Sequence, residues 1–113
     1  MGKKDNIIVT KTFNFACDVL DIEERLIEKR RFVLSKQVGS SGTSIGANVR
    51  ESQRAVSKPD FINKLGIALK EAEETQYWFE LIEKKVFTID EKVKAELEEI
   101  IKILVSIINS SKK

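Results

Sequence analysis

A seam of apolar and small residues in the segment 61–86 constrains the fold more than any other feature. Its members follow one another in alternating steps of four and three residues, which places them on one side of a helix. They are Phe61, Leu65, Ala68, Ala72, Thr75, Phe79, Ile82 and Val86. An unbroken heptad seam of this kind is typical of helices that pack in bundles. Trp78 and Leu81 fall beside the seam, which predicts a second contact for this helix.

The residues just before the seam predict where its helix begins. Ser57 is a suitable N-cap, and Pro59 follows in the first turn, where its missing N–H does no harm. Asp60 is placed to reach back and complete a capping box. We therefore expect a helix over residues 58–84.

The segment 7–28 is expected to be the first helix, because it carries two neighbouring apolar stripes. One stripe comprises Phe13, Ala16, Cys17, Leu20 and Ile27, and the other comprises Phe15, Val19, Ile22 and Leu26. Two stripes predict burial on two sides of the helix.

The segment 89–109 is expected to be the fourth helix, with Thr88 as N-cap and Glu91 as the third residue of a capping box. Its core stripe comprises Val93, Leu97, Ile100, Ile101, Leu104 and Ile108. Ile103, Val105 and Ile107 spread the apolar surface further round the helix than one bundle core uses. We therefore expect a subunit interface there.

The stretch SSGTSIGANVRESQRAVSKPDF, residues 40–61, differs in composition from the rest of the chain. A phosphate-binding P-loop would need a preceding strand and a lysine directly after its last glycine, but Ala47 follows Gly46. A linker would lack periodicity, whereas residues 34–54 sort onto distinct sides of a helix expected over 31–54. The core side carries Leu34, Val38, Ser41, Ile45, Val49 and Ser52, and the opposite side carries Lys36, Thr43, Ala47, Arg50 and Arg54.

The two flanks of this second helix carry small and polar residues. Gly39, Gly42 and Gly46 fall on one flank, where they would let another backbone approach closely. Ser44, Asn48 and Glu51 fall on the other flank. They could bond a neighbouring helix or form a solvated polar edge, and the spacing alone leaves both interpretations open.

Short connections between four amphipathic helices predict a single all-α domain over residues 1–113, an antiparallel up-down-up-down four-helix bundle. The single Cys17 excludes an internal disulfide, and the absence of histidine leaves no metal site of recognisable spacing. The charged start MGKKDN does not lead into an apolar run, so neither a signal peptide nor a membrane anchor is expected. We expect a cytoplasmic protein with no cofactor.

The formal charge of +2 conceals two oppositely charged blocks. Residues 29–70 hold nine Lys or Arg and two acidic residues, whereas residues 71–100 hold ten acidic residues and four lysines. The blocks could simply compensate each other on a solvated surface. Alternatively, the basic block could form a face for a polyphosphate.

The run from Phe32 to Lys85 resembles the small four-helix bundle family known from proteins encoded in intervening sequences of 23S rRNA genes, and the resemblance extends over residues 13–108. The residues that carry it are Ser40, Thr43, Ser44, Ile45, Asn48, Glu51, Arg54, Ser57, Phe61, Leu65, Ala68, Glu71 and Glu74. The chain is also similar, more distantly, to the accessory variability determinant of diversity-generating retroelements. Ser52 stands where many members have glycine.

The resemblance implies a ring-shaped homo-oligomer, specifically a homopentamer. It also implies association with RNA or DNA through a basic outer surface, and a reverse transcriptase or another protein as a further partner. Neither implication comes from the spacing of the residues.

A non-enzymatic accessory protein that binds nucleic acid is the function we expect. Its candidate contacts, called here the basic set, are Lys36, Arg50, Arg54, Lys58 and Lys64. Few aromatic residues accompany them, so we expect little direct reading of base sequence. The alternative is a scaffold for protein partners, in which the acidic third helix and Trp78 matter more. Glu71 and Glu74 lie one turn apart, but we interpret them as part of a solvated acidic face rather than a catalytic pair.

Overall fold

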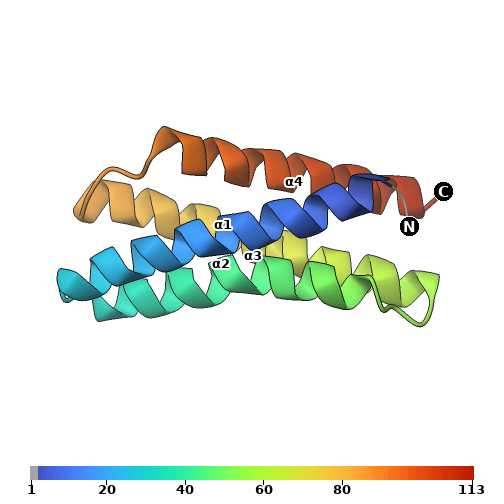
Figure 1. Ribbon diagram of the computed structural model, residues 1–113, viewed down its shortest axis with the longest axis horizontal. Coiled ribbons are helices and arrows are strands. Elements are labelled where there is room, and N and C mark those ends of the chain that lie inside the picture. The colour runs from blue at the N-terminus through green and yellow to red at the C-terminus, as the bar shows by residue number, and fades with distance from the viewer. Residues whose placement is uncertain (1–2) are drawn as a thin grey trace.

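The computed structural model describes the backbone of residues 3–113 and the side chains of residues 7–113. This part of the chain forms four helices and no strand: α1 (Lys3–Glu28), α2 (Phe32–Ser52), α3 (Lys58–Lys85) and α4 (Glu91–Ser111). They lie antiparallel in an elongated bundle of 45 × 23 × 19 Å (Figure 1). The predicted all-α four-helix architecture is confirmed. The start MGKKDN, from which we argued against a leader, lies outside the described side chains.

Helix α2 is the most closely packed of the four. It contacts α1 and α3 extensively, whereas α4 has fewer close approaches to α3 and α1. The chain reverses direction at the α1–α2 connection, and the α3–α4 loop lies at the same end of the bundle (Figure 1). The α2–α3 loop and the C-terminus lie at the other end.

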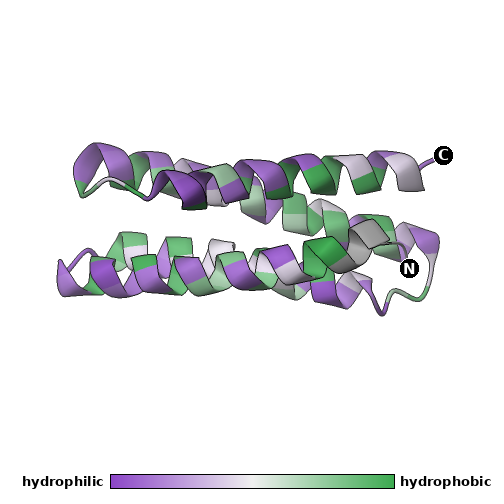
Figure 2. Cartoon of the chain, turned by 45° about the horizontal axis from the view of Figure 1, so that its top comes forward, coloured by the Kyte–Doolittle hydropathy of each residue, from purple (hydrophilic) through white to green (hydrophobic). Residues whose placement is uncertain are grey.

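Hydrophobic residues recur along all four helices (Figure 2), and the predicted seams of α2 and α3 form much of the core. Leu65, Ala68, Ala72, Thr75, Phe79 and Ile82 are buried, while Phe61 and Val86 at the ends of the seam are half-buried. Trp78 and Leu81 are also half-buried, and the Tyr77 ring stacks edge-on against Trp78 at 5.0 Å. On α2 the predicted core side is buried apart from Leu34, which is half-buried.

Only one of the two apolar stripes predicted on α1 belongs to the core. Phe15, Val19, Ile22 and Leu26 are buried together with Ile8. By contrast, the side chains of Phe13, Leu20 and Ile27 are 53%, 45% and 48% exposed. These three residues, seven apart in sequence, are called here the outer α1 stripe, and about half of the surface of each remains open to solvent in the single chain.

The glycine flank of α2 faces α1, as the sequence predicts. A Cβ atom on Gly42 would lie 2.6 Å from Cγ1 of Val19, closer than real side-chain contacts come. A Cβ on Gly46 would lie 3.3 Å from the backbone oxygen of Thr12. The two helices therefore approach each other at a distance that larger residues at these positions would prevent.

One buried polar contact joins α2 to α3. The hydroxyl of Thr75 lies 2.9 Å from the hydroxyl of Ser41 and 2.8 Å from the carbonyl oxygen of Glu71. Both hydroxyl groups are buried, so each would be costly to leave without a partner. Helical periodicity placed both residues in the core but did not reveal that they meet.

Two of the predicted helix starts differ from the structure in detail. Ser57 does cap α3, accepting a hydrogen bond from the Asp60 amide at 3.1 Å, but Asp60 reaches back to the Val56 amide and not to that of Ser57. The prediction of Thr88 as N-cap of α4 is wrong, because Asp90 caps that helix and accepts from the Lys92 amide at 2.8 Å. The helix starts later because Ile89 turns inward and is buried.

The surplus apolar surface on α4 is smaller than expected. Ile107, which we assigned to a subunit interface, is only 5% exposed and belongs to the core. Ile103 is half-buried, and only Val105 is exposed, at 39%. The bundle core is therefore wider at α4 than its heptad stripe indicated.

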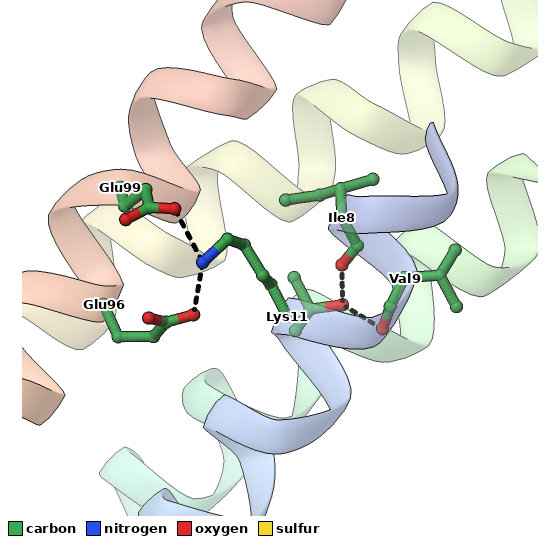
Figure 3. A network of polar contacts seen from close by, with 6 residues as sticks. Ile8, Val9, Lys11, Glu96 and Glu99 are labelled. Atoms are coloured by element: carbon green, nitrogen blue, oxygen red, sulfur yellow. Dashed lines mark hydrogen bonds and ion pairs between the residues drawn. The ribbon is translucent and has the colours of Figure 1, made fainter. Parts of the chain in front are cut away.

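Ion pairs fasten α4 to α1 and α3. Lys11 of α1 lies 3.1 Å from Glu96 and 2.6 Å from Glu99 of α4 (Figure 3). Lys94 of α4 lies 2.7 Å from Glu83 of α3. These side chains remain partly exposed, so solvent screens the pairs and each adds little to the stability of the bundle.

Helix α1 ends in a Schellman motif that leads directly into α2. The amide of Arg31 donates to the carbonyl of Leu26 at 2.8 Å, and that of Arg30 donates to Ile27 at 2.9 Å. Arg30 has a φ of 60°, a left-handed conformation in which glycine is the usual residue. An L-residue with a side chain costs roughly 1 kcal/mol there. Arg31 is also the N-cap of α2 and makes no side-chain capping bond.

Two glycine substitutions test the close contact between α1 and α2. Gly42→Ala should lower the free energy of unfolding by roughly 1–3 kcal/mol, because the new methyl group overlaps Val19. Gly66→Ala is the matched control, since a Cβ there meets nothing within 4 Å. It should raise stability by about 0.5–1 kcal/mol through helix propensity. Equal effects of the two substitutions in denaturant titrations would contradict the described packing.

Candidate nucleic-acid interface

The outward side of α2 carries the cations that the sequence singled out on this helix. Lys36 and Arg50 are both exposed, and so is Ala47 between them. Thr43 is half-buried and turns its hydroxyl to the Gly39 carbonyl of its own helix at 2.7 Å. Among the side chains that the structure describes, no acidic group pairs with Lys36, Arg50 or Arg54.

Arg50 stands beside an apolar groove between α1 and α2. Its guanidinium carbon lies 5.3 Å from the centre of the Phe13 ring, within the range of a cation–π contact. The groove has a volume of about 300 Å³. Its lining is formed by Val9, Thr12, Phe13, Ala16, Thr43, Gly46, Ala47 and Arg50. Arg50 therefore borders the outer α1 stripe as well as the basic surface.

The rest of the basic set lies around the α2–α3 loop. Arg54 falls in the turn after α2 and is exposed, so it is not on the helix as predicted. Lys58 is exposed and donates to a C-terminal oxygen of Lys113 at 2.9 Å. Lys64 is half-buried and pairs with Glu51 at 3.1 Å, which offsets its charge.

The structure therefore does not gather the basic set into one patch. Lys36 and Arg50 are 14 positions apart in the sequence, which corresponds to about 21 Å along a helix at 1.5 Å per residue. Arg50 and Arg54 lie at the end of α2 and in the turn after it, and Lys58 and Lys64 lie in the first two turns of α3, next to the α2–α3 loop. Lys36 lies in the second turn of α2, near the α1–α2 connection.

The polar flank of α2 contacts its own helix more than its neighbours. The Ser44 hydroxyl donates to the Ser40 carbonyl at 2.7 Å, and the Asn48 amide donates to the Ser44 carbonyl at 2.8 Å. Only Glu51 reaches another helix, through Lys64 of α3. The interpretation as a bridge between helices thus holds for one of the three residues.

The predicted site does not include three consecutive cations at the α1–α2 connection. Lys29, Arg30 and Arg31 are all exposed, and Phe32 and Val33 after them are 54% and 74% exposed. Residues 29–33 are called here the α1–α2 corner. The run of three cations was visible in the sequence. It contributes to the predicted basic block of residues 29–70 but not to the predicted site, because a helix end has no periodicity that would give its side chains a common face.

The pKa values of two carboxyl groups are raised above their ordinary range. Burial, and then the charge of Glu74, raise the pKa of Glu71 on α3. Burial also raises the pKa of Asp18 on α1, with further contributions from the nearby charges of Asp21 and Glu96. Repulsion of this kind between carboxylates on packed helices requires no catalytic role.

The part of the chain that the structure describes holds no candidate metal site and no candidate membrane span. Its cysteine and acidic side chains form no group of three that could hold a metal ion. No helix within it is long and apolar enough to cross a membrane.

Comparison with known families gives a clear match. The 23S rRNA-intervening sequence protein family matches residues 4–110, nearly the whole chain. The chain belongs to this family. A search of curated proteins gave no match.

A solved structure supports the family assignment. It is a protein of unknown function from the S23 ribosomal protein family of Bacteroides thetaiotaomicron, with 45% sequence identity and a TM-score of 0.87. The match covers 94% of this chain and 98% of that one. The family resemblance read from the sequence is thus confirmed, together with the four-helix fold.

The charges around Asp18 generate a stability prediction. Asp18 lines two cavities between α1 and α4, with Lys92 and Glu96 in one and Asp21 and Asp90 in the other. Lys92 lowers the pKa of Asp18, but burial and the three acidic neighbours outweigh it, so the ionised form is disfavoured in the folded state. Asp18→Asn should therefore raise the free energy of unfolding at neutral pH.

The sign of this effect can be followed with pH. Because the folded-state pKa of Asp18 is raised, its penalty is present above that pKa and disappears as the pH falls through it. The advantage of Asp18→Asn should therefore shrink in acid, as measured by denaturant titrations at several pH values. Glu24→Gln at an exposed position on the same helix serves as a control, because Glu24 does not contribute to the raised pKa of Asp18. An Asp18→Asn variant that is no more stable than the wild type at neutral pH would show that the ionised Asp18 carboxylate does not destabilise the folded state.

Proposed function

We propose that this chain is a non-catalytic accessory protein that assembles as a ring-shaped homo-oligomer and associates with RNA or DNA through the basic surface of α2. A cytoplasmic location is part of the proposal. The observation that carries it is the exposure of Lys36, Arg50 and Arg54 without an acidic partner among the described side chains. Unpaired exposed cations attract phosphate groups and release their counterions on binding.

Assembly is supported by the outer α1 stripe. Its three large apolar residues, Phe13, Leu20 and Ile27, are between 45% and 53% exposed. Cys17 on the same side of the helix is exposed as well. A second copy of the chain would remove this surface from water. A pentamer is the assembly that the family resemblance implies, and a ring would repeat the basic surface around its circumference.

A protein-binding scaffold is the second candidate. Tyr77 is 56% exposed and stacks on Trp78, on a helix that also carries exposed Glu73, Glu74 and Glu80. An exposed tyrosine packed on a half-buried tryptophan among acidic groups suits a protein partner with basic residues. Purification that retains a protein but no nuclease-sensitive material would favour this function.

The nucleic-acid role predicts a loss of binding when the basic surface is reversed. Arg50→Glu combined with Arg54→Glu should abolish retention of RNA and DNA at low salt, because phosphate contacts dominate such binding. The control reverses two exposed cations elsewhere, Lys70→Glu with Lys102→Glu. Filter binding and light-scattering mass report the two properties separately. Unchanged retention by the Arg50/Arg54 variant at an unchanged mass would overturn the proposed role.

The proposed assembly predicts that a charge in the outer α1 stripe separates the subunits. Leu20→Glu should reduce the light-scattering mass to that of one chain, with little loss of helical signal, because Leu20 is 45% exposed in the single chain. Ile67→Glu on α3 is the matched control at an exposed apolar position outside the stripe. A wild-type protein with the mass of one chain would show that no such assembly forms.

A further inference from the structure

The α1–α2 corner brings together exposed positive charge and exposed apolar side chains more densely than any other connection of the bundle. Lys29, Arg30 and Arg31 are exposed, and none forms an ion pair with a described acidic side chain. Lys36 lies one helical turn beyond Phe32 and is exposed too. The corner therefore has a concentrated positive charge beside an aromatic ring.

The packing of the bundle does not explain these residues. Arg30 occupies a left-handed position where glycine would be less strained, and Arg31 stands at an N-cap where Ser, Thr, Asp or Asn is preferred. The first turn of α2 contains no acidic residue to complement its dipole. Phe32 and Val33 are largely uncovered. The C-terminal dipole of α1 favours Lys29 and Arg30, but it accounts for neither Arg31 nor the exposed ring.

The position of Phe32 suits it to contact an unpaired base. Its ring is 54% exposed, and the Arg30 guanidinium lies over it, 5.7 Å from its centre. Planar guanidinium and phenyl groups are the surfaces on which bases of single strands stack. In a duplex the bases are already stacked and paired, so the ring would have nothing to contact.

We propose that the α1–α2 corner binds single-stranded nucleic acid, with Phe32 stacking on a base and Lys29, Arg30 and Arg31 contacting the backbone phosphates. This inference rests on the proposed function and names its substrate class. It also assigns a role to Lys36, which the structure places on the corner side of α2 and apart from Arg50. The cations near the α2–α3 loop would then provide contacts to phosphates that do not depend on strandedness.

Substitutions at Phe32 test the stacking contact. A fluorescein-labelled short oligouridylate and a duplex RNA of equal length serve as probes in fluorescence anisotropy titrations. Phe32→Ala and Phe32→Leu should each weaken binding of the oligouridylate by roughly tenfold and change duplex binding by less than about twofold. Phe32→Trp should preserve single-strand binding, because the larger ring also stacks.

A glycine at position 30 separates charge from folding. Arg30→Gly removes a cation but relieves the left-handed conformation, so its unfolding midpoint should equal or exceed that of the wild type. Its single-strand affinity should fall several-fold, and the slope of log affinity against log salt should decrease by roughly 0.7. Lys102→Ala on α4 is the control cation and should leave both quantities unchanged. Phe32→Ala should lower affinity without changing the slope.

The possible outcomes distinguish this inference from the function on which it rests. A wild-type protein that binds neither probe would refute both. Wild-type binding that is unaffected by the Phe32 and Arg30 variants would refute only the corner site. Loss of the oligomer in Phe32→Ala, measured by light scattering, would assign the ring to a subunit contact and overturn the inference. Binding of anionic phosphatidylserine vesicles that requires Arg30, without binding of oligouridylate, would also overturn it.

Discussion

The close approach of α1 and α2 is the constraint on which the rest of the structure depends. Gly42 and Gly46 allow it, because Val19 and the Thr12 backbone occupy the space that their side chains would fill. With one flank against α1 and its core side against α3, α2 is left with a single free side. That side carries Lys36 and Arg50. Helix α2 thus presents two exposed cations on its free side, and its short connection to α1 fixes where three further cations project.

Helix α4 is held in a different way. Its buried Leu97, Ile100 and Leu104 provide most of the stabilisation, since each fully buried apolar side chain contributes roughly 1.5–3 kcal/mol. The ion pairs of Lys11 and Lys94 lie at the edges of the helix and add less. The acidic groups around Asp18 oppose this packing at neutral pH. The less closely packed α4 side of the bundle is therefore the side whose stability depends on charge.

Helical periodicity predicted the fold because each seam is long and nearly uninterrupted. It placed Ser41 and Thr75 in the core and the glycine flank of α2 against a neighbour. It could not determine where α4 begins, since burial of Ile89 outweighs the capping preference of Thr88. Nor could it group the candidate site, because residues on one side of a helix can lie far apart along its axis, as Lys36 and Arg50 do. The α1–α2 corner lies outside any periodic segment, so its side chains acquire a common location only in the folded chain.

We assign the proposed contact with nucleic acid to α2 and to the α1–α2 corner that precedes it. Ultraviolet cross-linking of the full chain to a short oligouridylate, followed by mass-spectrometric mapping of the attached peptides, tests this assignment most directly. The account predicts attachment at Phe32 or its immediate neighbours. Attachment confined to Tyr77 and Trp78 on α3, or no attachment under conditions in which the protein retains the oligonucleotide, would contradict it.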